Sequence, residues 1–188
     1  MIMSVQIQKH CFSVDDYYRM ADAGVFPRDA RVELIEGEVI EMSPIGNRHA
    51  ACVDRLNALL NRSLQHKAIV RVQGPIRLND FSEPQPDIAL LKPRADFYSN
   101  SHPTPADVLL IIEVADTSVE YDRRVKLPLY ARAGIPQMWL MVLPKDIIEV
   151  HSQPVNGKYQ KIQRLKRGRT LVSPTVPGLS FKVDDLLG

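Results

Sequence analysis

The chain has 188 residues, of which 45% are hydrophobic and 24% are charged, a balance typical of a globular protein rather than a disordered or collagen-like one. Its 24 Lys and Arg residues against 22 Asp and Glu residues leave a formal charge of +2, which excludes a strong cationic field over the whole molecule. Apolar runs such as Val108 to Ile112 are too short to span a bilayer, and the N-terminal string MIMSVQIQKHCF lacks the pattern of a signal peptide. We therefore expect a single domain over residues 1–188 that is cytoplasmic and has no membrane partner.

Signals in the first part of the chain predict a helix, a hairpin and a longer amphipathic helix. Ser13 is a typical residue for a helix start, and Gly24 ends the helix that follows it. The Glu36-Gly37 pair lies between two short apolar runs, where it favours a tight turn. The predicted elements are a helix over 15–23, hairpin strands near 31–36 and 38–42, and a helix from 48 to about 65 with apolar residues every three or four positions.

Short extended runs separated by proline-rich loops dominate the rest of the chain. The run VLLIIEV has almost no polar alternation, which is typical of a strand covered on both faces in the middle of a sheet. A helix over about 121–133 separates it from the next strand, an order that favours an α/β (α+β) fold with a central mixed β-sheet flanked by helices. The predicted strands are 69–73, 76–78, 88–91, 107–115, 138–143, 147–151 and 158–163, and 92–106 is a predicted surface loop.

Two acidic residues interrupt otherwise apolar strands. Asp87 follows Pro86 at the start of the run IALL, and Glu113 lies near the end of VLLIIEV. A carboxylate in such a strand is costly to bury unless it is paired or binds a cation, so each one indicates either a structural ion pair or a functional site. Glu33 in the hairpin and Lys126 on the later helix add a third acid and an ammonium group that can converge with them at one margin of the sheet.

This set of side chains suits metal-assisted phosphate chemistry. Mg²⁺ prefers oxygen ligands, and two carboxylates suffice when the substrate supplies phosphate oxygens. Such a metal polarises the phosphate and lowers the pKa of its bound water, while a nearby lysine stabilises the developing negative charge or orients the attacking water. Cys11 and Cys52 lack the spacing of a zinc site or of a disulfide framework. The sequence therefore predicts a nuclease-like site that uses Mg²⁺ or Mn²⁺.

An ordered succession of strings carries a family resemblance. The strings are VELIEGEVIEMSP, His49 at the start of the long helix, VQGPIRL, PQPDIALL, ADVLLIIEVADTS, YDRRVKLPLYARAGIPQMWLM and IEVH. Over about residues 12–165 the chain resembles the bacterial restriction-endonuclease-like family of the Uma-two type. The resemblance implies a PD-(D/E)XK nuclease core, with a divalent-metal site at one end of the central sheet.

The resemblance also implies roles for individual residues. Asp87 and Glu113 match the metal-binding acids of the motif, and Glu33 matches an additional acid in the first hairpin. The motif lysine would stand two residues after Glu113, where this chain has Ala115, and Lys126 on the next helix takes its place.

Other residues have competing interpretations. Gln73 is similar to a motif-adjacent glutamine that holds water or metal, or it is a sheet-edge amide. His49 either acts on a phosphate or carries protons, or it caps or packs the long helix. Asp122, one turn before Lys126, predicts a surface ion pair with it. Pro128 lies inside the same predicted helix, so we expect that helix to kink or begin late, which would displace Lys126.

The favoured function is a divalent-metal-dependent endonuclease that hydrolyses phosphodiester bonds of DNA. Ala115 and Pro128 motivate an alternative, a non-catalytic nucleic-acid-binding or interaction module that keeps the nuclease fold. An enzyme of RNA or of repair intermediates is a third alternative, because a fold alone does not choose a substrate. Cutting both strands of DNA with one site requires two copies, which makes a homodimer the expected assembly.

The small net charge hides a polarity along the chain. Residues 1–118 hold 12 basic and 16 acidic groups, whereas residues 119–188 hold 12 basic and 6 acidic groups. A basic cluster in the second part either follows a phosphate backbone or is a solvated loop. Its members are Lys161, Arg164, Lys166, Arg167 and Arg169.

Overall fold

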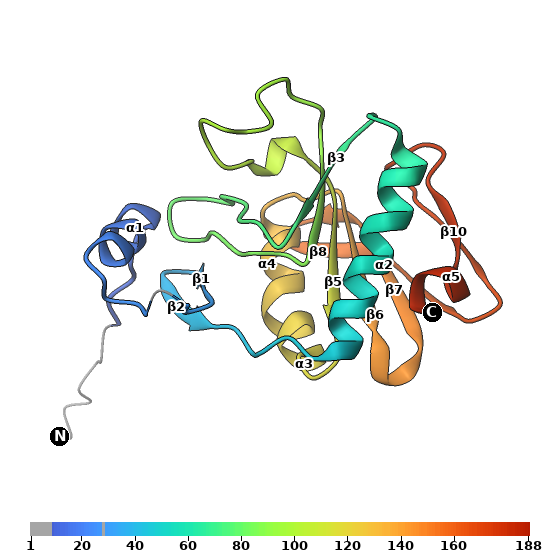
Figure 1. Ribbon diagram of the computed structural model, residues 1–188, viewed down its shortest axis with the longest axis horizontal. Helices are drawn as coiled ribbons and strands as arrows, with labels where there is room; N and C mark the ends of the chain where they lie inside the picture. Colours follow the sequence, from blue (N-terminus) through green and yellow to red (C-terminus); the bar gives the residue numbers. More distant parts are fainter. Residues whose placement is uncertain (1–8, 28) are drawn as a thin grey trace.

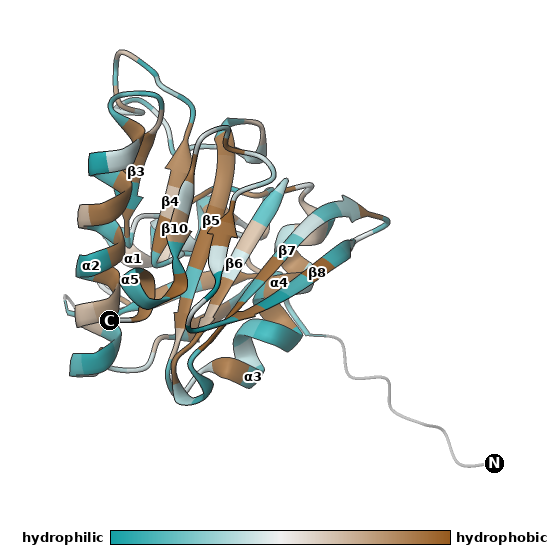
Figure 2. Ribbon diagram, turned by 90° about the vertical axis from the view of Figure 1, so that its right-hand side faces the viewer, coloured by the Kyte–Doolittle hydropathy of each residue, from teal (hydrophilic) through white to brown (hydrophobic). Residues whose placement is uncertain are grey.

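A six-stranded mixed sheet forms the centre of the computed structural model, which describes residues 9–27 and 29–188. The strand order is β3-β4-β5-β6-β7-β8; β5 and β6 run parallel, and the other neighbouring pairs are antiparallel. The β5 strand, Val108–Ala115, lies inside the sheet and is almost entirely buried, as its continuous apolar sequence predicts (Figure 2). The predicted mixed α/β fold is therefore confirmed.

The helices and strands follow the predicted order along most of the chain. The N-terminal part contains α1 (Val14–Asp22), the hairpin β1 (Val32–Ile35) and β2 (Glu38–Glu41), and α2 (Asn47–Leu64). The other sheet strands are β3 (Ile69–Val72), β4 (Ile88–Leu91), β6 (Gln137–Val142), β7 (Ile147–Val155) and β8 (Lys158–Lys166). Between β5 and β6 come α3 (Val119–Tyr121), a π-helical segment η2 (Asp122–Lys126) and α4 (Leu127–Arg132). The remaining elements are η1 (Pro105–Asp107), η3 (Leu143–Lys145), β9 (Thr170–Val172), β10 (Ser180–Lys182) and α5 (Val183–Leu187).

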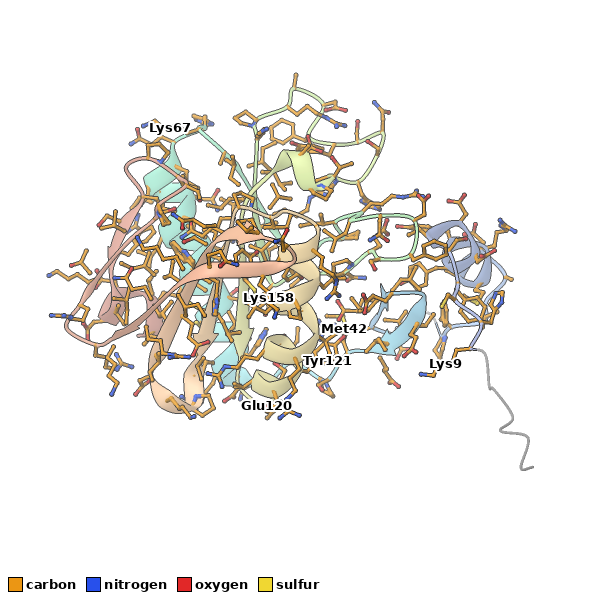
Figure 3. All side chains as sticks on the ribbon, turned by 180° about the vertical axis from the view of Figure 1, so that it is seen from behind. Lys9, Met42, Lys67, Glu120, Tyr121 and Lys158 are labelled. Atoms are coloured by element: carbon orange, nitrogen blue, oxygen red, sulfur yellow. The ribbon has the colours of Figure 1, made fainter. Side chains whose placement is uncertain are left out.

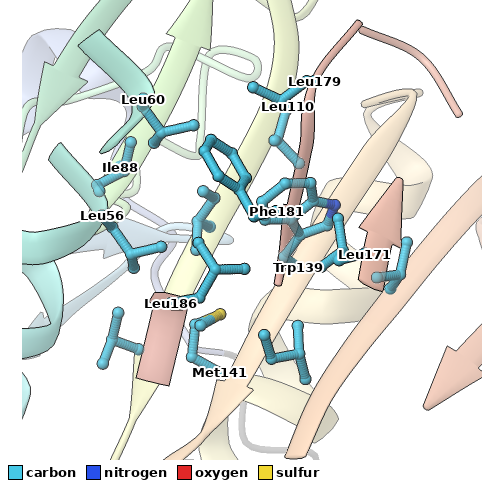
Figure 4. Close-up of a cluster of buried hydrophobic side chains, with 14 of the residues drawn as sticks. Leu56, Leu60, Ile88, Leu110, Trp139, Met141, Leu171, Leu179, Phe181 and Leu186 are labelled. Atoms are coloured by element: carbon cyan, nitrogen blue, oxygen red, sulfur yellow. The ribbon is translucent and has the colours of Figure 1, made fainter. Parts of the chain in front are cut away.

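Helices cover both faces of the sheet, and each face has its own core. The α2 and α5 helices lie on one side, and α4 lies on the other (Figure 1). Trp139 and Met141 of β6 point to the first side, where Leu56 and Phe181 pack with them (Figure 4). Met138 and Leu140 of the same strand belong to the second core. This alternation within one strand is the expected consequence of the pleat, which turns successive side chains to opposite faces.

Some local predictions are wrong. Ile76 and Leu78 are buried, but residues 76–78 form no strand, because their backbone N–H groups donate to Pro84, Pro103 and Ser82 in neighbouring loops instead of to a sheet strand. The strands β7 and β8 extend to Val155 and Lys166, beyond the predicted ends at 151 and 163. Asn156 and Gly157 form the turn between them with positive φ angles of 50° and 73°. The short elements β9, β10 and α5 were not predicted from the sequence.

The tight turn of the first hairpin depends on Gly37. Its φ is +81°, and a Cβ added there would lie only 2.5 Å from Cys11 Cβ. We expect Gly37→Ala to lower the free energy of unfolding by about 1–3 kcal/mol, because backbone strain adds to the collision. Gly134→Ala is the control, since Gly134 has a φ of +76° with open space around it. Urea unfolding should show a smaller loss for Gly134→Ala; equal losses would contradict the proposed collision.

Two expectations about the whole chain are not decided by the fold. Within residues 9–27 and 29–188, no helix is long and apolar enough to cross a membrane. Residues 1–8, which belong to the N-terminal string considered above, lie outside the described residues. The single domain over 1–188 and the cytoplasmic location stay predictions.

Candidate active site

Asp87 and Glu113 are brought together by the pairing of two strands. The antiparallel register of β4 and β5 places Ile88 opposite Ile112, so Asp87 and Glu113 are the next opposing residues. The backbone N–H of Asp87 donates to Glu113 Oε2 at 3.3 Å, and the backbone N–H of Val114 donates to Asp87 Oδ2 at 2.9 Å. Both carboxylates are therefore held by backbone donors at the same end of the sheet.

Lys126 reaches the same point from the helical crossover. Its Nζ lies 3.3 Å from Glu113 Oε1 and 3.3 Å from Glu33 Oε2. Glu33 is held in turn by the backbone N–H of Gln85, which donates to Glu33 Oε2 at 3.0 Å. Two acids and the ammonium group thus form one buried cluster, and Glu113 links it to Asp87. The convergence of four segments expected from the sequence is what the structure shows.

The π-helical segment η2 explains why Pro128 does not displace Lys126. A proline in an α-helix clashes with the carbonyl four residues earlier and removes a backbone donor. Here the turn before it is widened, with the N–H of Leu127 donating to the carbonyl of Asp122, five residues back. Pro128 then occupies the first turn of α4, where proline is tolerated. The helix does change at this point as expected, but Lys126 stays directed at the two acids, so the expected displacement is wrong.

A pocket of about 470 Å³ opens onto these residues. Asp87, Glu113 and Lys126 line it, although only 8%, 3% and 5% of their respective surfaces are exposed. Further lining residues come from the β2–α2 connection and from the segment after β5. Asp87, Glu113 and the buried Lys126 therefore share one concave site, as is usual for the polar groups of a ligand pocket.

On the pKa of Glu113 and on that of Lys126, burial and neighbouring opposite charges act in opposite directions. Burial raises the pKa of Glu113 to about 8, although the nearby Lys126 ammonium opposes this shift. For Lys126, burial alone would lower the pKa, but Glu113, Glu33 and further acids outweigh it and raise the pKa. The lysine is therefore charged at neutral pH, whereas burial favours the protonated form of Glu113.

His49 and Gln73 both contact Asp87, but unequally. His49, in the first turn of α2, places Nε2 at 3.0 Å from Asp87 Oδ2, and it lines the pocket. This contact is the main reason that the pKa of His49 is raised. Gln73 lies just beyond β3 and reaches Asp87 Oδ1 only at 3.5 Å, outside the pocket lining. Of the two accessory candidates, His49 is the one in the pocket.

Asp122 is not the surface ion-pair residue expected from the sequence. It is buried, lines the pocket, and makes no ion pair within the described residues. Its Oδ2 accepts a hydrogen bond of 2.6 Å from the Ser118 hydroxyl. Burial is the main cause of its raised pKa. The reason for the error is that η2 turns this side of the helix toward the pocket instead of toward solvent.

A buried carboxylate with a single neutral donor should cost stability. We expect Asp122→Asn to raise the free energy of unfolding by about 1 kcal/mol at pH 8, because the amide oxygen still accepts from Ser118 and no charge is buried. The gain should shrink as the pH falls toward the ordinary carboxyl range, where the folded protein already holds Asp122 protonated. Urea unfolding at pH 8 and at a pH in the ordinary carboxyl range tests this. A variant that is less stable than the unchanged protein at pH 8 would contradict it.

Two tyrosines complete the site and were not identified from the sequence. Tyr130 is fully buried on α4 and donates its hydroxyl to Glu113 Oε1 at 2.7 Å. Tyr121 lines the pocket and donates to Glu33 Oε1 at 3.3 Å. The available signal was the spacing of Asp122, Lys126 and Tyr130, which recur every four residues and so share one side of a helix.

The basic cluster does not line this pocket. Its residues lie on and after β8, the edge strand, which is separated from β5 by β6 and β7. Arg164 Nε donates to the buried Glu149 at 3.0 Å, and Arg167 contacts Asp146 at 3.3 Å. Within the described residues, those that make no ion pair are Lys161, Lys166 and Arg169.

Glu149 also ties the lysine-bearing helix to the sheet. Arg123, on η2, donates to Glu149 Oε1 at 2.9 Å, and Glu149 Oε2 accepts a hydrogen bond of 3.3 Å from His151 Nε2. Because Arg123 is three residues before Lys126, this ion pair fixes the segment from which Lys126 extends. Arg164 is thus part of a structural ion-pair network, and its phosphate contact stays a prediction.

The donor set fits Mg²⁺ or Mn²⁺ better than a structural zinc ion. In the described part of the chain, no point is surrounded by three or more His, Cys, Asp or Glu side chains able to hold a metal. Two carboxylates, Asp87 and Glu113, do face the pocket. That number is sufficient for Mg²⁺ or Mn²⁺ when water and substrate supply the other oxygens, whereas a structural zinc site needs four protein ligands.

Comparisons with known proteins show the family and the fold of the chain. Residues 14–184 match the family model Uma2, described as "Putative restriction endonuclease". Among solved structures, the chain is similar to a protein from Anabaena variabilis described as "a putative nuclease belonging to DUF820", with a TM-score of 0.71 and 16% identity over 94% of this chain and 97% of that chain. At this identity the likeness shows the fold alone. No curated protein matches the chain.

Proposed function

The chain belongs to the Uma2 family, and from this premise we propose that it is a divalent-metal-dependent endonuclease that hydrolyses phosphodiester bonds of DNA. The observation that carries the proposal is the convergence of Asp87, Glu113 and Lys126 on one pocket from three separate segments. Two carboxylates next to a buried ammonium group are what metal-assisted phosphoryl chemistry requires.

Each residue has a distinct task in this proposal. Asp87 and Glu113 would hold the cation, which supplies Lewis-acid polarisation of the phosphate and a water of lowered pKa when bound. Lys126 donates hydrogen bonds to a non-bridging phosphate oxygen and neutralises the charge that develops on it. Glu33 keeps Lys126 charged and aimed at the pocket, and Tyr130 keeps Glu113 in place. His49 orients Asp87 through its 3.0 Å contact.

The non-catalytic alternative loses its main structural motivation. It rested on Ala115, where the motif has lysine, and on the expected displacement of the helix by Pro128. Lys126 contacts both acids despite Pro128, so an ammonium group is present where the reaction needs one. A binding module would have little need of a buried lysine held by two carboxylates, an arrangement that is costly to desolvate.

Purified protein should hydrolyse DNA in the presence of Mg²⁺ or Mn²⁺ and not in EDTA. We expect Asp87→Asn and Glu113→Gln each to lower the rate at least about 100-fold, since each removes a charge from the cation site. Nicking of supercoiled plasmid and cleavage of a labelled oligonucleotide are the measurements. Asp54→Asn is the matched control, because Asp54 is exposed on α2 outside the pocket and should keep full activity.

Two outcomes would contradict the proposal. Activity that survives both substitutions would reject the site, and DNA binding without hydrolysis under either metal would favour the binding module. Replacing the DNA by RNA of the same sequence tests the substrate class. The homodimer stays a prediction that light scattering tests. The phosphate contacts of the basic cluster also stay predictions, which the salt dependence of binding tests; its members are Lys161, Arg164, Lys166, Arg167 and Arg169.

A further inference from the structure

The reactive groups of the pocket can be reached only from inside it. Asp87 and Glu113 are almost completely buried, and the exposed part of each faces the pocket. Lys126 is 5% exposed. A scissile phosphate must therefore enter the pocket to contact these groups, because none of them projects from the protein surface.

Two stretches of chain form walls on either side of the entrance. One wall is the connection between β2 and α2, of which every residue from Glu41 to Gly46 lines the pocket. The other is the segment after β5, represented by residues 116–118, Tyr121 and Asp122. In Figure 1 the first connection runs past α3 before α2 begins. The floor with its acids thus lies between two walls that come from distant parts of the sequence.

The walls and the floor differ in chemistry. Met42 and Ile45 give the first wall an apolar surface beside the polar Glu41 and Ser43. Tyr121 gives the second wall an aromatic ring beside the polar residues 116–118 and Asp122. Met42 and Tyr121 are both labelled in Figure 3. Asp87, Glu113 and Lys126 make the floor polar and charged. A nucleotide has the same division, since its base is apolar on its faces and its phosphate is charged.

We propose that the pocket takes a single DNA strand, with a phosphate at the floor and a base against the apolar walls. This inference rests on the proposed nuclease function and specifies its substrate. In an intact duplex the phosphates lie on the outside but each base is stacked and paired, so a base can contact the walls only after it leaves the stack. A single strand needs no such unstacking, and bases pack on aromatic and apolar side chains without sequence preference. One cut suffices for a single strand, so one copy of the chain is enough.

The decisive experiment compares one labelled oligonucleotide alone and annealed to its complement. With Mg²⁺, we expect kcat/KM for the single strand to be at least about tenfold higher than for the duplex, because the duplex must first unpair. Without divalent cation, fluorescence anisotropy at constant ionic strength should show at least about tenfold tighter binding of the single strand. In a duplex with a single-stranded tail, cleavage should fall within the tail.

A matched pair of variants tests the apolar wall. Ile45 and Ile162 are 41% and 50% exposed, but only Ile45 lines the pocket. We expect Ile45→Ala to raise KM for the single strand about threefold or more, and Ile162→Ala, on β8, to leave it unchanged.

The possible results separate this inference from the function on which it rests. Equal or faster cleavage of the duplex, or equal binding of both forms, overturns the single-strand proposal while the nuclease function stands. If neither form is hydrolysed, the nuclease function fails, and the anisotropy ratio alone decides whether the pocket prefers a single strand. Absence of binding to either form rejects both.

Discussion

Replacing Lys126 with methionine is expected to lower DNA hydrolysis at least about 100-fold and to destabilise the fold by about 3–5 kcal/mol. The loss of activity follows from the missing positive charge at the phosphate. The loss of stability follows from Glu33 and Glu113, which are 1% and 3% exposed and would be left without their shared cation. Nicking assays and urea unfolding measure the two effects.

Controls distinguish the buried ammonium group from a general effect of removing a lysine. Lys145→Met, at an exposed site outside the pocket, should change neither property. If Lys126→Met does not fold, the double variant Lys126→Met with Glu33→Gln should be more stable than the single variant, because it buries one charge fewer. Added Mg²⁺ should stabilise Lys126→Met more than the unchanged protein. A Lys126→Met protein of unchanged stability would contradict the buried cluster.

The second large effect is a dependence of stability on pH that comes from Glu113. Its folded-state pKa of about 8 exceeds the ordinary value of 4.5, so the folded protein keeps a proton that the unfolded chain loses. This contribution to stability is fully present below the ordinary value and disappears as the pH rises toward about 8. Without divalent cation, we expect the free energy of unfolding to fall over this interval by an amount on the order of a few kcal/mol.

Comparison with Glu113→Gln isolates this effect, because His49 and Asp122 also have raised pKa values and add slopes of the same sign. The variant should lack the part of the slope that Glu113 causes, whereas Asp54→Asn should retain it. Mg²⁺ should flatten the slope of the unchanged protein, since a cation favours the ionised carboxylate. Identical pH dependence in Glu113→Gln and in the unchanged protein would refute the raised pKa.

Much of the fold follows from local patterns in the sequence. The capped helix after Ser13, the turn at Glu36-Gly37 and the apolar spacing of α2 are properties of short segments, and the structure confirms them. The position of β5 inside the sheet was predictable because a strand covered on both faces needs no polar residues. Residues 76–78 were assigned wrongly because a buried loop and a buried strand have the same apolar composition.

The acids of the site were identifiable for a related reason. Asp87 and Glu113 stand out from apolar strands, where a charge requires an explanation. A charged residue within an apolar strand is visible in the sequence. The burial of a side chain under a neighbouring turn is not. Asp122 was predicted to lie at the surface because its burial depends on the π-helical segment around it. Tyr130 belongs to the site through the hydrogen bond from its hydroxyl to Glu113, a contact that no local pattern by itself indicates.

By itself, the sequence determined which elements form and which residue types are available for chemistry, because propensity, capping and periodicity act over short distances along the chain. Only the tertiary structure decided which of these residues meet. The register of β4 and β5 sets Asp87 against Glu113, the widened turn before Pro128 aims Lys126 at both Glu113 and Glu33, and the β2–α2 connection covers them to make a pocket. Meetings of this kind depend on packing between segments far apart in the chain.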